Sequence, residues 1–551
     1  MAENAVKRLF FFYTDKFSEL CSVKILKRMK RIVLMLVPLL MLAACERDEH
    51  TGSSRAPLTE VEHGMIQLGE KLDDPYTVEN MRAALAKVYP TKADRIDITA
   101  TDLYVRFLPE DDEQMTTLRK LGLNLTDHPV DYRIVREGDY YQDPEVGDNA
   151  ITWQYAVVPH DFTFPAGIRK EVLDECYISE HDPVTRADPD IDWLSVEQEA
   201  FRLTGNGEMW DDITKGGEKA APAGRITIED PGFSGGKPIG VAGVKVAANI
   251  FVKIAYAYTD RDGYYKMEKT FNGNPRYRLI FANEKGFDIG FNFIILPASV
   301  SALGTGSKEG IDLHVNTESD AALFRRCVVN NAAYDYYSRC TDTDLDITAP
   351  PEDLRIWIFP DLTCSSACMF HHGPFVHIDL LDVYIGAWMP LIRIFMPDVT
   401  LGTREQDYAG IYSVTCHELA HASHFAQVGT DYWNAYIDYV AQSFMAEGNN
   451  PYGTGTGEKA GYCEVGEMWA YFMQESLKKD RYGGTLTSFG NQFWFKPDIL
   501  SYLYEHGISR GELFRALGKD ITSSDDLREE LIVRYPGKEA MIEQTFKSYG
   551  K

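Results

Sequence analysis

The sequence is poor in basic residues for its size. Among its 551 residues, 56 are Lys or Arg and 83 are Asp or Glu, which gives a formal net charge of -27. Because nucleic-acid binding rests largely on basic side chains that neutralise phosphates, this balance argues against a nucleic-acid partner. Hydrophobic residues make up 44% of the chain and charged residues 25%, values that exclude wholesale disorder. At about 150 residues per domain, the length predicts three or four domains.

Cysteine is also scarce, with nine in the whole chain. Two of them, Cys21 and Cys45, lie near the N-terminus and are considered separately. An odd number remains, so at least one thiol stays unpaired within the chain. Cys364 and Cys368 lie four residues apart, which favours a local disulfide. A zinc ribbon on these two would need a second cysteine pair at matching spacing, and the sequence lacks one.

Residues 29–45 (MKRIVLMLVPLLMLAAC) have the pattern of a signal peptide. A basic pair precedes an apolar run that is too short to span a bilayer as a helix. The ending Leu-Ala-Ala-Cys resembles the lipobox of bacterial lipoproteins, which implies cleavage before Cys45 and attachment of lipid to it. The alternative is a buried apolar segment with an incidental cysteine. We expect Met29 to be the true start of translation, because a signal peptide normally begins at the N-terminus and residues 1–28 would precede it.

Residues 46–56 are polar and predict a solvated tether. Their first four residues (ERDE) resemble the surface-export signal of Bacteroidetes lipoproteins. This resemblance implies an outer-membrane lipoprotein that is exposed at the cell surface, and attachment facing the periplasm is the alternative. In both cases the lipid anchor lies in a membrane and the remaining chain lies outside the cytoplasm.

Residues 57–210 are predicted to form an α+β domain. Alternating β-formers predict strands at 97–108 (DITATDLYVRFL) and 153–158 (WQYAVV). Helical spacing of apolar residues predicts helices near 58–88, 168–178 and 195–204. No residues here have catalytic spacing. The region resembles the N-terminal regions of Bacteroidetes lipoproteins, a resemblance that implies no particular role.

Residues 225–298, which follow a predicted linker at 211–224, change to short strands separated by turns. Turn signals about every ten residues favour a β-sandwich. The pattern PIGVAGVKV…TDRDGYY resembles the carboxypeptidase regulatory-like, transthyretin-type domain, which implies a hairpin turn at Asp-Gly and an inward-facing aromatic residue after it. Asp260 and Asp262 do not form an EF-hand loop, because that loop needs an acid or amide at the position of Tyr258.

Residues 310–551 are predicted to be mainly helical, with a small sheet. Capping residues precede a helix that runs to about Tyr337, and strands are expected at 355–359 (RIWIF) and 391–401 (LIRIFMPDVTL). A long helix is predicted from about residue 408 to Gly429, where a glycine is typical of a helix end. Apolar spacing in residues 495–551 predicts a helical cap behind that helix.

The long helix carries the sequence His417-Glu418-Leu-Ala-His421, an HExxH motif. Because the two histidines are four residues apart, both imidazoles leave the same face of the helix and can hold one zinc ion. Glu418 lies about 100° round the helix from His417, which suits a general base acting on a water molecule at the metal. The alternative is a buried helix whose histidines are bonded to protein neighbours.

A catalytic zinc ion normally has a third protein ligand. The metzincin pattern would place glycine and histidine where this chain has His424 and Gln427, so that class is excluded. We interpret His424 as a residue that lies beside the site or serves in plain packing. Cys416 and Cys463 each sit near predicted ligands, and a disulfide between them is a hypothesis whose alternative is a pair of buried thiols.

A second predicted helix around residues 461–475 offers Glu464 and Glu467 as the third ligand. The sequence Glu467-Met-Trp-Ala resembles the E-x-x-A form of the gluzincins, which implies Glu467, with Glu464 as the alternative. The family's frequent acidic residue four positions on is Tyr471 here, so a carboxylate that orients a zinc-bound histidine must come from elsewhere. Candidates for stabilising the developing oxyanion are Tyr432, Tyr436, Tyr452, His371, His372 and His377.

The gluzincin resemblance covers these two helices only and implies a zinc metallopeptidase that acts on a peptide or protein substrate. The fold is then a multidomain α+β protein with an N-terminal α+β domain, a central β-sandwich and a C-terminal, mainly helical zincin-like domain with a small sheet. One alternative is a surface-binding lipoprotein whose peptidase-like fold is inactive, and another is a purely structural zinc site. Glu418 favours activity, because a structural zinc site has no use for a base.

Overall fold

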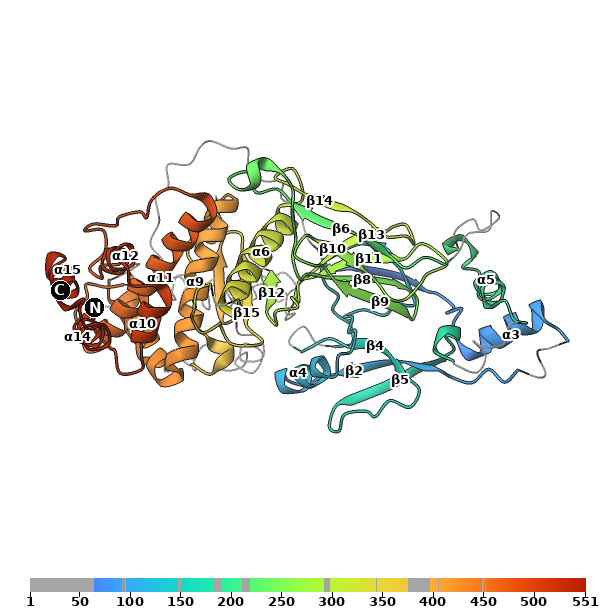
Figure 1. Ribbon diagram of the computed structural model, residues 1–551. Coiled ribbons are helices and arrows are strands. Elements are labelled where there is room, and N and C mark those ends of the chain that lie inside the picture. Colours follow the sequence, from blue (N-terminus) through green and yellow to red (C-terminus); the bar gives the residue numbers. More distant parts are fainter. Residues whose placement is uncertain are drawn as a thin grey trace, which may run out of the picture.

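The structure of the chain is a computed structural model, and Figure 1 shows the arrangement of its helices and strands. It describes residues 64–91, 93, 96–146, 150–182, 190–210, 219–291, 298–342, 344–374, 397–404, 406–447, 450 and 452–551. The predicted signal peptide and tether, Cys45 and His377 lie outside the described residues. The described chain is a multidomain protein of mixed helix and sheet, with a helical C-terminal region and several small sheets.

The N-terminal region contains a three-stranded antiparallel sheet of order β4-β2-β5. Its strands are β2 (Asp102–Leu108), β4 (Gln154–Pro159) and β5 (Arg169–Cys176). Strands β2 and β4 confirm two of the predicted strands. The helix predicted near 168–178 is wrong, because this segment is strand β5 and pairs with β2 along its length. Arg106 of β2 pairs with Glu171 of β5 at 2.5 Å, so a charged residue of the edge strand β5 forms an ion pair with the neighbouring strand.

Two helices and a second small sheet complete this region. Helix α3 (Val78–Val88) packs on α5 (Trp193–Leu203) through a buried cluster that includes Met81, Leu85, Val196 and Ala200. The sequence predicts a helix from residue 58, but Gln67–Lys71 is strand β1, which pairs with β3 (Tyr132–Arg136). Helix α3 begins only after Thr77, whose hydroxyl accepts the backbone N–H of Asn80 at 3.2 Å.

Two four-stranded sheets occupy the middle of the chain (Figure 1). The first has the order β10-β6-β14, with β7 also paired to β6, and the second has the order β13-β11-β8-β9. Alternate residues of both sheets, such as Ile226 and Leu279, share one buried core. The strands are β6 (Ala223–Ile228), β7 (Ile239–Gly240), β8 (Lys245–Ile250), β9 (Lys253–Tyr258), β10 (Tyr264–Lys266), β11 (Arg276–Ile280), β13 (Val300–Thr305) and β14 (Leu313–Val315).

The turn predicted from the Asp-Gly pair joins β9 to β10. The carboxylate of Asp260 accepts the backbone N–H groups of Asp262 and Tyr264, each at 2.9 Å. Gly263 has a φ of +85°, and a Cβ atom there would lie 2.0 Å from the carbonyl oxygen of Ile226 on β6. Glycine is therefore required by both the backbone conformation and the close approach of the neighbouring strand.

The C-terminal region combines a small parallel sheet with a layer of helices. The sheet has the order β12-β15-β16 and consists of β12 (Asp288–Phe291), β15 (Arg355–Phe359) and β16 (Val399–Gly402). Strand β12 thus lies within the range predicted for the sandwich but pairs with the strand RIWIF. The helices are α6 (Ala321–Thr341), α9 (Tyr408–Val428), α10 (Thr430–Glu447), α11 (Ala460–Tyr482), α12 (Asp498–Glu505), α13 (Arg510–Ala516), α14 (Ser524–Arg534) and α15 (Glu539–Ser548).

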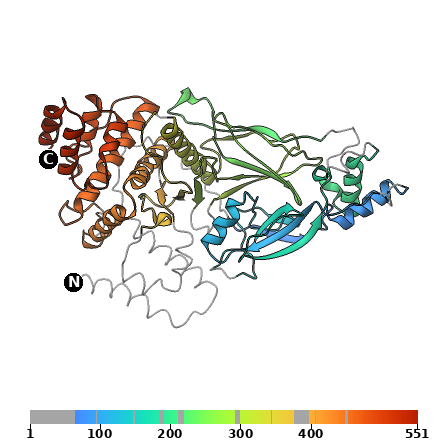
Figure 2. The same ribbon diagram turned by 60° about the horizontal axis from the view of Figure 1, so that its bottom comes forward.

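Helix α9 lies in the centre of this helical layer. It packs against α6 on one side and α11 on the other, and Figures 1 and 2 show the three helices side by side. The indole N–H of Trp469 on α11 donates to the carbonyl oxygen of Ala420 at 3.2 Å. On the other side, the hydroxyl of Tyr336 on α6 lies 3.0 Å from that of Ser423. Contacts on both sides therefore fix the rotation of α9 about its axis.

Buried ion pairs join the N-terminal region to the rest of the chain. The guanidinium of Arg326 on α6 bonds Asp139 at 2.7 Å, and both side chains are almost fully buried. Arg355 of β15 bonds Asp112 at the start of α4 (Asp112–Lys120), also at 2.7 Å. Arg119 on the same helix pairs with a carboxylate of β12. Unpaired buried charges are costly, so these pairs hold the regions in one arrangement.

Candidate metal centre

The residues of the HExxH motif lie in the middle of helix α9, where the helix is buried. The helix begins after Asp407, whose carboxylate accepts the backbone N–H of Gly410 at 3.0 Å. It ends at Gly429, which has a φ of +84°. The start, the length and the end of this helix confirm the prediction from the sequence.

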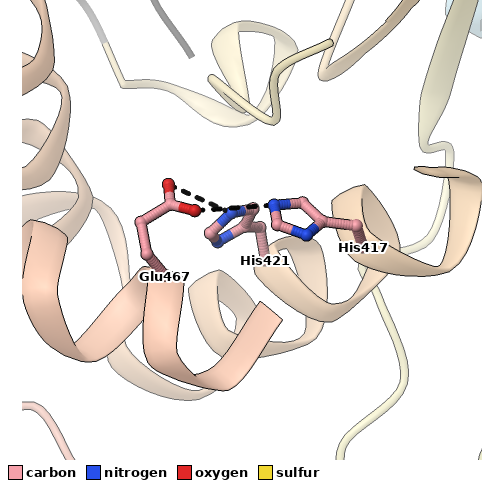
Figure 3. Close-up of side chains that lie close together, drawn as sticks. All are labelled: His417, His421 and Glu467. Atoms are coloured by element: carbon pink, nitrogen blue, oxygen red, sulfur yellow. Dashed lines mark ion pairs between the residues drawn. The ribbon is translucent and has the colours of Figure 1, made fainter. Parts of the chain in front are cut away.

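Two histidines of α9 and one glutamate of α11 come together between the two helices (Figure 3). Nε2 of His417 lies 3.5 Å from Oε2 of Glu467, and Nε2 of His421 lies 3.5 Å from Oε1 of the same carboxylate. All three side chains are buried, with exposed fractions of 2% or less. The potential ligand atoms lie within 4.8 Å of one another, so the group can hold a metal ion.

The spacing of these atoms fits a shared metal ion better than direct hydrogen bonds. Ligand atoms at about 2.0–2.1 Å from one tetrahedral metal ion are about 3.4 Å from each other. The two nitrogen–oxygen distances of 3.5 Å end on different oxygens of Glu467 and are close to this value, and the three ligand atoms together lie within 4.8 Å of one another. Oε2 of Glu467 and Nε2 of His417 have no hydrogen-bond partner among the described residues. Buried polar atoms are rarely left unbonded, and a cation between them would satisfy both.

Burial and mutual attraction set the charges of the group. Burial lowers the pKa of His421, and the nearby Glu467 carboxylate offsets this only in part. At His417 burial acts in the same direction, but Glu467 and Glu418 outweigh it and the pKa is raised. Burial raises the pKa of Glu467, but the two imidazoles outweigh burial and lower the pKa to about 2. Glu467 is therefore ionised at neutral pH, as a metal ligand must be.

Glu418 lies next to the group but is not one of its members. Its side chain is buried, with 1% exposed, and its charge contributes to the raised pKa of His417. It also faces the segment before β16, because burial and, to a smaller extent, the Glu418 carboxylate raise the pKa of Cys368 to about 12. Glu418 thus flanks the two histidines as the helical spacing predicts, between α9 and the Cys364–Cys368 segment.

Tyr436 of α10 takes a role that the sequence does not indicate. It is one of the predicted oxyanion candidates, but its hydroxyl donates a hydrogen bond to Oε1 of Glu467 at 2.6 Å. Its ring lies 5.6 Å from that of His421, measured between centroids. Burial raises the pKa of Tyr436 well above its usual value, and Glu467 adds to this effect. The phenol therefore stays protonated and holds the carboxylate that faces the histidines.

Tyr471 occupies the position where the gluzincins frequently have an acidic residue. Its ring meets the ring of His417 edge to face, with centroids 4.6 Å apart. Its hydroxyl lies 3.0 Å from that of Tyr452. An aromatic contact, rather than a carboxylate from this position, thus supports His417. The side chain of Gln474, one further turn along α11, also contributes to the raised pKa of that histidine.

Glu464, the alternative third ligand, does not join the group. One carboxylate oxygen accepts the backbone N–H of Ser524 at the start of α14, at 2.9 Å. The other oxygen bonds the ammonium group of Lys551. Both partners belong to the C-terminal helices, so Glu464 faces the predicted helical cap. Glu467, one turn later on α11, is the carboxylate that faces α9.

The disulfide hypotheses are wrong. Cys416 and Cys463 are buried free thiols, and so is Cys364, while Cys368 is a half-buried free thiol. Cys416 directly precedes His417, so its side chain leaves α9 about 100° away from the metal group. Burial and, to a smaller extent, the charge of Asp335 on α6 raise the pKa of Cys416 to about 12, which locates the thiol on the α6 side. Cys463 lies on α11, on the opposite side of α9.

The remaining predicted residues contact or bond groups within the fold, although neither ring nitrogen of His424 has a hydrogen-bond partner among the described residues. His424 is fully buried between the rings of Tyr432 and Trp433, and burial lowers its pKa to about 3. It is therefore a neutral packing residue. The other oxyanion candidates bond as follows: Tyr432 to the carbonyl of Ile521 at 2.9 Å, Tyr452 to Tyr471 at 3.0 Å, and His372 to Asp398 at 2.9 Å, while His371 lies 3.6 Å from Asp112.

No protein-family model matches this chain, and a search of curated proteins finds no match. The assignment of the metal centre therefore rests on its residues and their geometry. Within the described part of the chain, every helix is too short or too polar to span a bilayer.

Proposed function

We propose that this protein is a zinc-dependent metallopeptidase. The observation that carries the proposal is the buried meeting of His417, His421 and Glu467, with Glu418 beside them on the same helix. Two imidazoles and one carboxylate are a donor set of catalytic zinc sites, in which one coordination position stays open. The 3.5 Å distance from each imidazole nitrogen to the Glu467 carboxylate supports an ion held between these side chains.

The chemistry divides between the ion and the side chains around it. A zinc ion in this group would lower the pKa of a water molecule to about 7 and polarise the carbonyl of a peptide bond. Glu418 would accept the proton of the attacking water and deliver it to the nitrogen of the leaving amine. Glu467 supplies the negative ligand, and Tyr436 holds that carboxylate through its hydroxyl.

The proposal extends to the location and the domains of the chain. The signal-peptide pattern of residues 29–45 supports a lipoprotein that is anchored through Cys45 and faces outward from the outer membrane. The shared core of the two central sheets supports a transthyretin-type β-sandwich between an α+β domain and a zincin-like domain. Mass spectrometry of the mature N-terminus tests the anchor, since a lipid-modified Cys45 is expected there.

The activity is tested with a peptide library, the wild type and three matched glutamate variants. Glu418→Gln should keep zinc and lose about 100-fold or more in kcat, because it removes the base. Glu467→Gln should lose zinc as well as activity, because it removes a charged ligand. Glu464→Gln, one turn earlier on α11, is the control and should retain both, since Glu464 bonds Ser524 and Lys551.

Two results would count against the proposal. If zinc-loaded wild type cleaves no peptide across a broad library, the alternative of an inactive surface-binding lipoprotein gains. If Glu418→Gln cleaves as fast as the wild type, Glu418 is not the base. Equal loss of zinc from Glu464→Gln and Glu467→Gln would contradict the assignment of the third ligand.

A further inference from the structure

A second buried polar group lies far from the metal, on the outer face of the sheet β13-β11-β8-β9. Strand residues alternate between the two faces, and Tyr277 and Leu279 of β11 point into the core. Arg276 and Arg278 of the same strand therefore point outward. On β8 the register places Lys245 opposite Ile280, so Lys245 also points outward.

The register brings Lys245 and Arg278 close together. Arg278 lies directly opposite Ala247 of β8, two residues from Lys245, so the two cations are diagonal neighbours on adjacent strands. Long side chains at such positions reach each other across about 7 Å. Ala247, which lies between them on β8, is small and is itself buried. On its other side Ala247 lies opposite Tyr256 of β9.

Arg278 is a buried cation without a bonded anion. Only 4% of the residue is exposed, its Nε has no hydrogen-bond partner, and no carboxylate among the described residues bonds its guanidinium. Burial and the neighbouring Arg276 lower the pKa of Arg278 to about 10, which shows how unfavourable its charge is there. Burying a charge without an opposite charge bonded to it is strongly unfavourable.

The carboxylates nearest to Arg278 already have other partners. Glu137 bonds Arg276, with one nitrogen–oxygen distance of 3.1 Å. Asp127 bonds Nδ1 of His128 at 2.7 Å and accepts the backbone N–H of Tyr141 at 2.5 Å. The carboxylates of the N-terminal region near Arg278 therefore bond other residues, and neither forms an ion pair with Arg278.

Lys245 also has no bonded anion among the described residues, but it is partly exposed to solvent. Its ammonium group lies 4.1 Å from the centroid of the Tyr256 ring, and it forms no ion pair with the described residues. Burial, with smaller contributions from the charges of Arg119 and Arg278, lowers its pKa to about 8, although Asp288 opposes them. Asp288 is itself paired with Arg119. Two adjacent cations thus lack an anion, in a chain whose net charge is -27.

We propose that Arg278 and Lys245 bind one oxyanion group, a carboxylate, sulfate or phosphate, on the outer face of this sheet. The planar guanidinium offers paired N–H donors to such a group, and the ammonium adds a point charge. Tyr256 and Tyr258 line the open side, with exposed fractions of 40% and 37%, so an organic ligand could place its body against their rings. This site is separate from the metal group and does not depend on it.

The test measures binding of sodium sulfate by calorimetry at constant ionic strength, with chloride as the reference salt. The wild type should bind one sulfate saturably. Arg278→Met and Lys245→Met should weaken binding by about tenfold or more, because each removes a charged donor. Lys266→Met, an exposed lysine of the other sheet, is the matched control and should bind like the wild type. Arg278→Lys should restore part of the affinity.

A second arm distinguishes the source of the oxyanion. A sugar sulfate that binds more tightly than inorganic sulfate indicates a ligand that also contacts Tyr256, whereas the reverse order indicates the free ion. Sulfate should also slow the reaction of Lys245 with an amine-directed reagent, because the bound anion keeps the amine protonated. The proposal is overturned if the wild type shows no saturable binding above chloride, or if Arg278→Met binds sulfate as tightly as the wild type.

Discussion

Replacement of Tyr436 by phenylalanine tests whether the hydroxyl of α10 holds the metal-binding carboxylate. The variant removes one atom, the phenolic oxygen that bonds Oε1 of Glu467 at 2.6 Å. The ring contacts remain, with centroids 4.8 Å from Trp433 and 5.6 Å from His421. The expected effect is therefore a loss of orientation at Glu467 and not a loss of packing.

The size of the effect follows from the role of the bond. Hydrogen bonds to charged groups contribute about 1.5–3 kcal/mol, and loss of a partner that orients a ligand costs about 10–100-fold in metal affinity. The same hydrogen bond is present before metal binds, so most of its energy is common to the metal-free and metal-bound protein. Only its effect on the orientation of Glu467 changes the affinity for metal. We therefore expect a loss near the lower end of that range, about 10-fold.

The assay is competition for zinc with a coloured chelator, and Tyr432→Phe is the matched control. Tyr432 lies on the same helix and is also buried, but its hydroxyl donates to the carbonyl of Ile521 at 2.9 Å. The control should lose stability without losing zinc affinity. An unchanged zinc affinity in Tyr436→Phe, or an equal loss in both variants, would falsify the proposed role of Tyr436.

Three further predictions concern the stability of the fold. Burial lowers the pKa of His372, but Asp398 outweighs this effect and the pKa is raised. The stability that this ion pair contributes is therefore complete below the unfolded pKa of about 6.5 and is lost as the pH rises through the folded pKa. The loss of Tm in His372→Gln should be larger at pH 5.5 than at pH 8.5, and equal losses would contradict this. Arg326→Met removes the buried guanidinium that bonds Asp139 and should cost about 3–5 kcal/mol in chemical unfolding; a change below about 1 kcal/mol would refute the importance of this pair. Gly263→Ala should cost about 1–3 kcal/mol or more through backbone strain and collision with β6, which a lowered Tm would report and an unchanged Tm would exclude.

The parts of the metal centre that local spacing determines could be predicted from the sequence. His417 and His421 share a helix face because of the helical repeat, whatever surrounds the helix. The third ligand needed a resemblance, since nothing local to α11 distinguishes Glu467 from Glu464. In the structure that distinction comes from the C-terminal helices. The backbone N–H of Ser524 bonds the carboxylate of Glu464, whereas Glu467 faces α9.

The errors in the fold have a common physical origin in pairing between distant segments. The segments of β1 and β5 are short edge strands with charged residues, and their periodicity alone does not separate them from helices. Strand β12 follows sandwich strands in the sequence, but it pairs in parallel with β15, which lies more than sixty residues further along the chain. Such pairing depends on the packing of α6 against the sheet, which no local pattern encodes.

The partners of buried polar groups separate structural roles from binding roles in this chain. The charges of Arg326 and Asp139 pair with each other, and Glu464 is bonded by the C-terminal helices, so none of these charges needs a counter-ion from outside the protein. Nε2 of His417 and Oε2 of Glu467 have no hydrogen-bond partner among the described residues and suit a cation, whereas Arg278 has no bonded carboxylate among those residues and suits an anion. The two groups favour ligands of opposite charge and lie in different parts of the fold. Each therefore predicts its own class of ligand, and loss of either ligand should leave the binding of the other unchanged.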